Sequence, residues 1–171
     1  MLKPSFFLSP FSLFLAGFIM LGALSSTQAA SLSSKAPLQI VADELIADEK
    51  SGISEYRGSV VITQDKFKLS GDVIKIKHPK NQLQTILVVG KPAKFEQYLQ
   101  EDKNWVRGQA NQILYNAVTE KVELTGTAIV QQDQKHEIKG ESLTYDLANE
   151  TLQAKGSKST KQRIEVTLQP E

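Results

Sequence analysis

Near-repetition of short strand-like segments is the feature that most limits how this chain can fold. The stretch YRGSVVITQD, residues 56–65, recurs in pattern as LTGTAIVQQD, residues 124–133. Each has a glycine at its third position, then a small hydroxyl residue and three apolar residues, and each ends in Gln-Asp. Such repetition is typical of stacked supersecondary units, which share one core because a single unit cannot bury its apolar face alone.

Glycines mark out four copies of a strand-turn-strand unit. Three copies open on Gly71, Gly108 and Gly140, and a less regular fourth copy opens on Ala42 and ends on Gly58. The starts fall 29, 37 and 32 residues apart. A glycine at each corner allows the backbone to bend sharply or to take a positive φ. The repeats therefore predict an all-β, antiparallel stack.

One segment and two prolines have to be placed within this repeat. ADELIADEK, residues 42–50, is the best helical candidate, but it aligns with the other copies and is predicted to be one strand and the turn after it. Pro79 and Pro92 are expected in turns or at strand starts, where a missing N–H does no harm.

Apolar residues alternate with polar residues along almost every predicted strand. Successive side chains of a strand point to opposite faces, so the alternation assigns the apolar residues to one inward face. In DVIKIKH, Ile74 and Ile76 face inward, whereas Lys75 and Lys77 face outward. An apolar face must pack against something, either as a closed core or as a partly open interior that holds an apolar ligand. The alternation alone leaves both possibilities open.

The first 29 residues have the pattern of a secretory signal. Lys3 is the only charge before an apolar run at residues 11–24, and small residues precede an expected cleavage site at Ala29. We therefore expect residues 1–29 to be cleaved and residues 30–171 to form a single domain. The alternative is an uncleaved membrane anchor. The chain has no cysteine, so it has neither a lipid-bearing cysteine nor a disulfide framework.

Charge and motif content argue against several classes of function. Loss of the signal removes one of the 20 basic residues and none of the 19 acidic ones, so the mature domain is formally neutral. A neutral domain without a basic stripe argues against a nucleic-acid partner. His78 and His136 have no partners at metal-ligand spacing. We expect no metal, no cofactor and no catalytic residues.

Two further classes of protein fit the residues poorly. A glycan-acting enzyme needs a pair of carboxylates in a cleft, but the acids clustered at residues 43–49 lie on a predicted strand end and turn. An integral outer-membrane barrel needs aromatic girdles at its strand ends, but aromatic residues make up 7% of the chain. The basic residues near Lys91 and Lys158 could contact phosphates, although such charges usually belong to a solvated face.

Taken together, the signal, the glycine-closed repeats and several short motifs resemble the OstA-like family. The motifs are the two repeated corners, GKPAKF at residues 90–95 and GESLTYD at residues 140–146. Their order and spacing match the family from about Pro37 to Leu168. The corners depart from the Thr-Gly-Asn that is usual there, since they read Arg-Gly-Ser at residues 57–59 and Thr-Gly-Thr at residues 125–127.

The resemblance implies a fold and a function. The fold is a folded-over antiparallel sheet, a β-taco or β-jellyroll, open at both ends. The function is that of a non-enzymatic carrier in the periplasm, which binds the lipid A acyl chains of lipopolysaccharide in an apolar interior and bridges the inner and outer membranes. The implied partners are lipopolysaccharide, an LptC-like inner-membrane protein, an LptD-like outer-membrane protein, and further copies of the same chain bound head to tail.

The resemblance and the alternation together give the expected site residues. Leu38, Ile40, Phe95 and Tyr115 match the lipid-lining positions of the family, and all four fall on the inward face. The predicted lipid-binding set is Leu38, Ile40, Val60, Ile62, Phe67, Leu69, Ile74, Ile76, Phe95, Ile113, Tyr115, Leu124 and Tyr145. The predicted edges for assembly with partners are Leu38 and Ile40 at one end, and Ile164, Val166 and Leu168 at the other.

The main alternative is a structural spacer. A β-repeat protein with a dry, closed core would mediate protein contacts in the periplasm and bind no lipid. The two functions differ in whether the inward face takes up a hydrophobic ligand.

Overall fold

The computed structural model describes residues 36–99, 103–132, 135–146, 149, 151–159 and 161–169. The predicted signal, residues 1–29, lies outside the described residues. The described chain consists of strands joined by turns, with one short 3-10 turn, η2 (Pro79–Asn81). The strands are β1 (Gln39–Val41), β2 (Glu44–Asp48), β3 (Ile53–Gln64), β4 (Phe67–Lys77), β5 (Thr85–Leu99), β6 (Asn104–Asn116), β7 (Lys121–Gln132), β8 (His136–Asp146), β9 (Thr151–Lys155) and β10 (Glu165–Leu168). The all-β prediction is confirmed.

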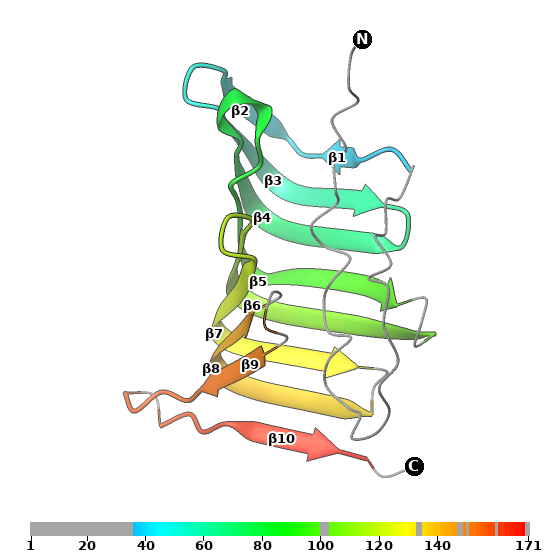
Figure 1. Cartoon of the computed structure of the whole chain (residues 1–171), viewed down its shortest axis with the longest axis vertical. Helices are drawn as coiled ribbons and strands as arrows, with labels where there is room; N and C mark the ends of the chain where they lie inside the picture. Colours follow the sequence, from blue (N-terminus) through cyan, green and yellow to red (C-terminus); the bar gives the residue numbers. More distant parts are fainter. Residues whose placement is uncertain are drawn as a thin grey trace.

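All ten of these strands belong to one antiparallel sheet in which the order follows the chain. The order is β1-β3-β4-β5-β6-β7-β8-β10, with β2 paired to β3 and β9 paired to β8 (Figure 1). Strand β2 and the turn after it occupy residues 44–52, which confirms the prediction for the segment ADELIADEK. Because consecutive strands pair, the sheet has two free ends, formed by β1 and β2 and by β9 and β10.

The long strands are bent near their middles. Pairing between neighbours loses register between Arg57 and Val60, Ser70 and Val73, Val89 and Ala93, Gln109 and Gln112, and Thr125 and Ala128. Such bulges bend a strand and sharpen its twist. Because the breaks lie on neighbouring strands, the whole sheet folds along one line, and Figure 1 shows the strands curving at one side of the molecule.

The fold line divides the sheet into two legs. The first leg contains β2, β9 and residues 53–57, 73–77, 85–89, 112–116, 121–125 and 142–146. The second leg contains β1, β10 and residues 60–64, 67–70, 93–99, 104–109, 128–132 and 136–140. The apolar sides of both legs form the inner face, so the expected folded-over sheet is confirmed.

Glycine provides positive φ at the two repeated corners. Gly58 has φ +80 and Gly126 has φ +82, and each is followed by a second positive-φ residue, Ser59 or Thr127. Glycine adopts this backbone region without the steric cost that a Cβ imposes. The matching sequences YRGSVVITQD and LTGTAIVQQD therefore form the same bend in β3 and β7, as predicted.

Two expectations about the corners are wrong. Gly108 does not form the corner of β6, because it stays paired with Phe95 and Val130 and the register breaks only after Gln109. Pro92 lies neither in a turn nor at a strand start. It lies inside β5, within the break between Val89 and Ala93, where no ladder hydrogen bond requires its missing N–H.

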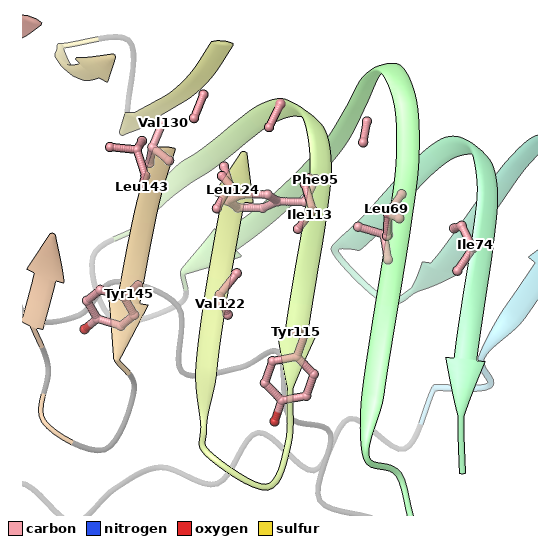
Figure 2. Close-up of a cluster of buried hydrophobic side chains, with 14 of the residues drawn as sticks. Leu69, Ile74, Phe95, Ile113, Tyr115, Val122, Leu124, Val130, Leu143 and Tyr145 are labelled. Carbon is pink, nitrogen blue, oxygen red and sulfur yellow. The ribbon is translucent and has the colours of Figure 1, made fainter. Parts of the chain in front are cut away.

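The core runs along the inner face of both legs. Its buried apolar residues are Val60, Ile62, Leu69, Ile74, Val88, Ala93, Phe95, Val106, Ala110, Ile113, Tyr115, Val122, Leu124, Ala128, Val130, Leu143 and Tyr145. Figure 2 shows the larger of these side chains gathered on one side of the ribbon. Burying each large side chain stabilises the fold by about 1.5–3 kcal/mol relative to leaving it exposed.

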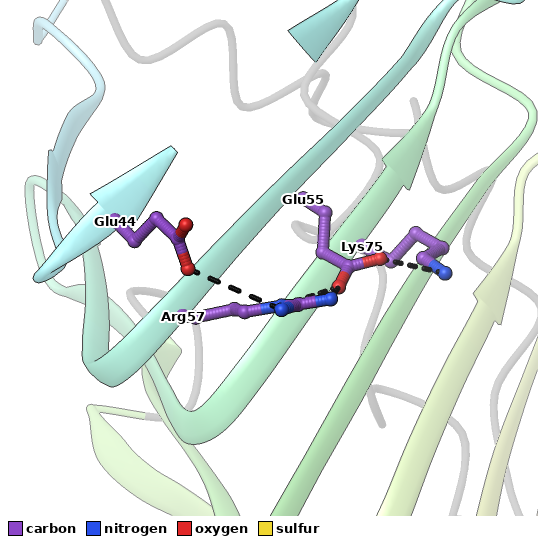
Figure 3. A network of polar contacts seen from close by, with 4 residues as sticks. All are labelled: Glu44, Glu55, Arg57 and Lys75. Atoms are coloured by element: carbon purple, nitrogen blue, oxygen red, sulfur yellow. Dashed lines mark hydrogen bonds and ion pairs between the residues drawn. The ribbon is translucent and has the colours of Figure 1, made fainter. Parts of the chain in front are cut away.

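The outer face carries ion pairs across neighbouring strands. The Glu55 carboxylate on β3 lies 2.7 Å from Lys75 Nζ on β4 and 2.5 Å from an Arg57 guanidinium nitrogen, and Arg57 also lies 4.0 Å from Glu44 on β2 (Figure 3). The Lys75 ammonium and then the Arg57 guanidinium hold the pKa of Glu55 below its ordinary value. Charged residues therefore cover the face opposite the core.

Candidate functional site

Strand register arranges the inner face of the first leg into two rows that cross the sheet. The deep row, next to the fold line, is Tyr56, Ile74, Val88, Ile113, Leu124, Leu143 and Ala154. The rim row, two residues farther from the fold line, is Ser54, Ile76, Ile86, Tyr115, Val122, Tyr145 and Leu152. Both rows run without a break from the β3 end to the β9 end.

The second leg has two corresponding rows. Its deep row is Ile40, Ile62, Leu69, Phe95, Gly108, Val130, Ile138 and Val166, and it connects β1 with β10. Its rim row is Gln64, Phe67, Gln97, Val106, Gln132, His136 and Leu168. The deep rows are almost wholly apolar, whereas the rim row of the second leg mixes apolar and polar residues.

Most of the predicted site residues fall in these rows. Ile40, Ile62, Leu69 and Phe95 share the deep row of the second leg, and Ile74, Ile113 and Leu124 share that of the first. Ile76, Tyr115 and Tyr145 lie in the rim row of the first leg, Phe67 in that of the second, and Val60 beside the fold line. The structure therefore brings these twelve residues onto one continuous face.

Leu38 differs from the other predicted residues. It precedes β1, which begins at Gln39, and 55% of its surface is exposed. Leu38 was expected on the inward face with Ile40, but β1 is shorter than the apolar pattern and does not include it. Leu38 instead adds an exposed apolar side chain at the β1 end of the sheet.

Some inner-face residues were missing from the predicted set. Val106 and Ala110 are buried, and Gln97 is buried although it is polar. Alternation extended in both directions from Phe95 and Gly108 would have found all three. Gln97 was not predicted to face inward because glutamine is polar.

Large apolar side chains remain exposed at both free ends of the sheet. At the β10 end, Ile164, Val166 and Leu168 are 45%, 53% and 57% exposed, and Ile164 lies just before the strand. At the other end, Leu45 of β2 is exposed to the same extent as Leu38. The inner face thus continues as far as the end strands, where no further strand of the described residues covers it.

Tyr115 is one of two tyrosines buried on the inner face. Its side chain is 4% exposed, and burial, with a smaller contribution from the charge of Glu120, raises its pKa to about 12. Its hydroxyl is therefore neutral at physiological pH. Tyr115 and Tyr145 lie on the same side of the aliphatic cluster, with Val122 of β7 between them in the row (Figure 2). The rim of the first leg is consequently apolar but carries two phenolic groups.

Within the described ranges, no three His, Asp or Glu side chains are grouped so that they could hold a metal ion. His78 lies with its Nε2 2.9 Å from the Ser54 hydroxyl, as part of a hydrogen bond between a turn and β3. No helix in this part of the chain is long and apolar enough to cross a membrane.

The fold and the inner face define a class of protein: an open antiparallel sheet, folded lengthwise around an apolar interior, with two free ends. Residues 39–151 match the family model described as "LptA/(LptD N-terminal domain) LPS transport protein". The chain belongs to this family of lipopolysaccharide transport proteins, which confirms the OstA-like resemblance.

Individual relatives agree with the family match. The lipopolysaccharide export system protein LptH of Pseudomonas aeruginosa is 34% identical over 161 residues, covering 90% of this chain and 91% of that protein. The lipopolysaccharide export system protein LptA of Escherichia coli K12 is 31% identical over 136 residues, covering 78% and 71%.

A solved structure has the same fold. The crystal structure of Pseudomonas aeruginosa LptH, described as the LptA-homologous periplasmic component of the lipopolysaccharide transport device, superposes with a TM-score of 0.68 at 31% identity. The match covers 80% of this chain and 98% of that one. The folded sheet is therefore shared with a lipopolysaccharide transport component.

Proposed function

We propose that this protein is a non-enzymatic carrier of lipopolysaccharide, which holds the lipid A acyl chains along its inner face. The observation that carries the proposal is the apolar inner face, whose deep rows run from one free end of the sheet to the other. Family membership supports the same function, since the relatives are lipopolysaccharide export proteins.

The physical need for such a face follows from the properties of the lipid. Exposing an acyl chain to water costs about 0.8 kcal/mol per CH₂. A chain of about twelve carbons therefore costs roughly 10 kcal/mol, and a lipid with several chains cannot cross an aqueous compartment unaided. A continuous apolar face removes this cost through many weak contacts. The ligand is never fixed at one deep site, so it can move on.

The free ends suggest how the carrier joins its partners. Unpaired strand edges can accept a strand of another chain, and such contacts extend head to tail when they do not close. We propose that the β1 end, with Leu38 and Ile40, and the β10 end, with Ile164, Val166 and Leu168, are the assembly edges. The chemistry fits a second copy of this chain, an LptC-like inner-membrane protein or an LptD-like outer-membrane protein, because related sheets would continue the apolar rows.

The proposed location is the periplasm, reached through cleavage of residues 1–29. Two observations support it. The apolar run at residues 11–24 has the pattern of a secretory signal. The related LptH is described as a periplasmic component. A carrier of this kind functions in the aqueous space between two membranes, where an acyl chain has no other apolar surface to pack against.

Solution binding separates the carrier from the spacer. Purified protein should bind rough lipopolysaccharide, and binding should be lost for the oligosaccharide released from its acyl chains. Ile76→Glu, in the rim row of the first leg, should weaken binding about tenfold or more, since it places a charge against the acyl chains. Lys77→Glu, on the outer face of the same strand, is the matched control and should leave binding unchanged. A folded wild-type protein that binds neither lipopolysaccharide nor a hydrophobic dye would support the spacer instead.

A further inference from the structure

The rim row of the second leg contains polar side chains, although acyl chains could not form hydrogen bonds with them. The row contains Gln97 on β5 and His136 on β8, and register places both on the inner face. Asn104 on β6 lies on the same face, two residues beyond Val106 toward the rim. The corresponding row of the first leg has one small hydroxyl, Ser54, and two phenols among aliphatic residues.

Each of these three polar side chains has a buried atom without a hydrogen-bond partner. The atoms are Gln97 Oε1, Asn104 Oδ1 and His136 Nδ1, and no other buried side-chain atom of the described residues is left in this state. Gln97 is 6% exposed, so its oxygen has little access to water. The coincidence of all three on one rim indicates a common cause.

An unpaired buried polar group is costly. Leaving a buried donor or acceptor unsatisfied costs about 1–3 kcal/mol, and more than roughly 90% of such groups in folded proteins have a partner. A leucine of similar size at position 97 would avoid this cost and extend the apolar face. A hydrogen-bonding ligand at the rim would explain why polar residues stand there, because it would supply the missing partners.

We propose that Gln97, Asn104 and His136 form a hydrogen-bonding subsite for the hydroxyl and amide N–H groups in the polar part of the carried lipid. The subsite rests on the proposed carrier function and adds to it a place for the head of the lipid. Carboxamide oxygens accept from such donors, and the imidazole nitrogen accepts or donates according to its tautomer. Gln97 and His136 are three strands apart, roughly 14 Å, so the groups meet different parts of a large head group.

The position of these three residues at the rim fits the separation between the acyl chains and the polar head of the lipid. Acyl chains pack against the deep rows, which are apolar on both legs. The polar head remains attached to the chains and lies where they emerge, at the edge of the leg. Polar residues in the second-leg rim would therefore hold the head while the first-leg rim continues to contact the chains.

The test compares two probes on the purified full domain. The first probe is rough lipopolysaccharide, and the second is pyrene, which is apolar and has no hydrogen-bond donor. Gln97→Leu should weaken lipopolysaccharide binding about three- to tenfold, the range expected for one lost hydrogen bond, and leave pyrene binding unchanged or stronger. His136→Leu should do the same independently. Gln109→Leu, the same chemical change on the outer face of β6, is the control and should alter neither affinity.

The outcomes separate the subsite from the carrier function. Wild-type protein that binds no lipopolysaccharide overturns the carrier function itself. If the wild type binds but Gln97→Leu and His136→Leu retain full affinity, the subsite is wrong, and water satisfies these groups. Equal losses for lipopolysaccharide and pyrene, together with a lowered melting temperature, would also overturn it, since they indicate a structural role.

Discussion

Gly108 shows how a single residue sets the shape of the inner face. A Cβ built at this position would overlap the Phe95 ring, which is 1% exposed and packed in the core. The backbone of Gly108 has ordinary strand pairing with both neighbours, so close approach rather than conformational freedom requires glycine here. Phe95, the largest of the fully buried side chains, thus depends on the absence of a side chain at Gly108 on the adjacent strand.

Substitution at this site should be costly. We expect Gly108→Ala to lower the free energy of unfolding by about 1–3 kcal/mol, because the added methyl overpacks a tightly filled site. Urea unfolding measures the change. Phe95→Leu in the same chain should recover part of the loss, with a coupling of at least about 0.5 kcal/mol in the double-mutant cycle. Strictly additive effects would show that the two residues do not compete for the same space.

Thr127 carries a different kind of local strain. Its φ is +52, a region in which a β-branched residue is a rare outlier, whereas asparagine adopts it readily. The side chain is exposed, so packing gives no reason for threonine. We expect Thr127→Asn to stabilise the fold by roughly 0.5–1 kcal/mol, measured by thermal unfolding. A neutral or destabilising effect would mean that the corner relaxes without strain.

Glu55 should make stability depend on pH. Its ion pairs with Lys75 and Arg57 hold its pKa below the ordinary value in the folded state, so the unfolded chain binds more protons near pH 4. This contribution is present above about pH 4.3 and is lost as the pH falls through the lower folded-state pKa. Glu55→Gln should therefore flatten the decline in stability between about pH 5 and pH 3. An unchanged slope in urea titrations at these pH values would contradict the assignment.

At the scale of elements, the sequence predicted the strands better than the bends. Period-two alternation depends only on which face of a strand is buried, and that signal is local, as in DVIKIKH. The corner of β6 was predicted at Gly108, but the register breaks only after Gln109. The pairing with two neighbouring strands sets the position of such a break, and the residue types at Ala110 and Asn111 do not indicate it. Gln97 was not predicted as an inner-face residue because its side chain is polar, yet the structure buries it. Leu38 was expected on the inward face, but it precedes β1 and is exposed.

Strand β10 is the element on which assembly should depend. All four of its residues are exposed, and it pairs with β8 on one side only. Val166 continues the deep row of the second leg, whereas Thr167 faces outward. Val166→Asp should abolish or strongly reduce head-to-tail oligomers, because an inward-pointing charge blocks strand addition at an edge.

Light scattering at several protein concentrations measures this effect. The matched control is Thr167→Asp, which places the same charge on the outer face and should leave assembly intact. Both variants should keep the wild-type melting temperature within a few degrees, since neither site is buried. Full oligomers of Val166→Asp would show that the β10 end is not an assembly edge.

At the scale of the whole molecule, the folded sheet separates two surfaces. Charged residues such as Glu55 and Lys75 cover the outer face, and the deep rows give an uninterrupted apolar path between the end strands. We propose that acyl chains travel along this path through its full length. A path that stopped midway would hold lipid without passing it from one end to the other.

Site-specific photocrosslinking in lipopolysaccharide-exporting cells tests that claim most directly. A photoreactive residue would be placed on the inner face at Ile40, Tyr115 and Val166, which sample both ends and the middle. Val41 and Thr167, outward neighbours on the end strands, serve as controls. Lipopolysaccharide adducts at all three inner positions and at neither control are the predicted result. Adducts on the outer face, or the lack of adducts at any one of the inner positions in a folded and exported protein, would contradict it.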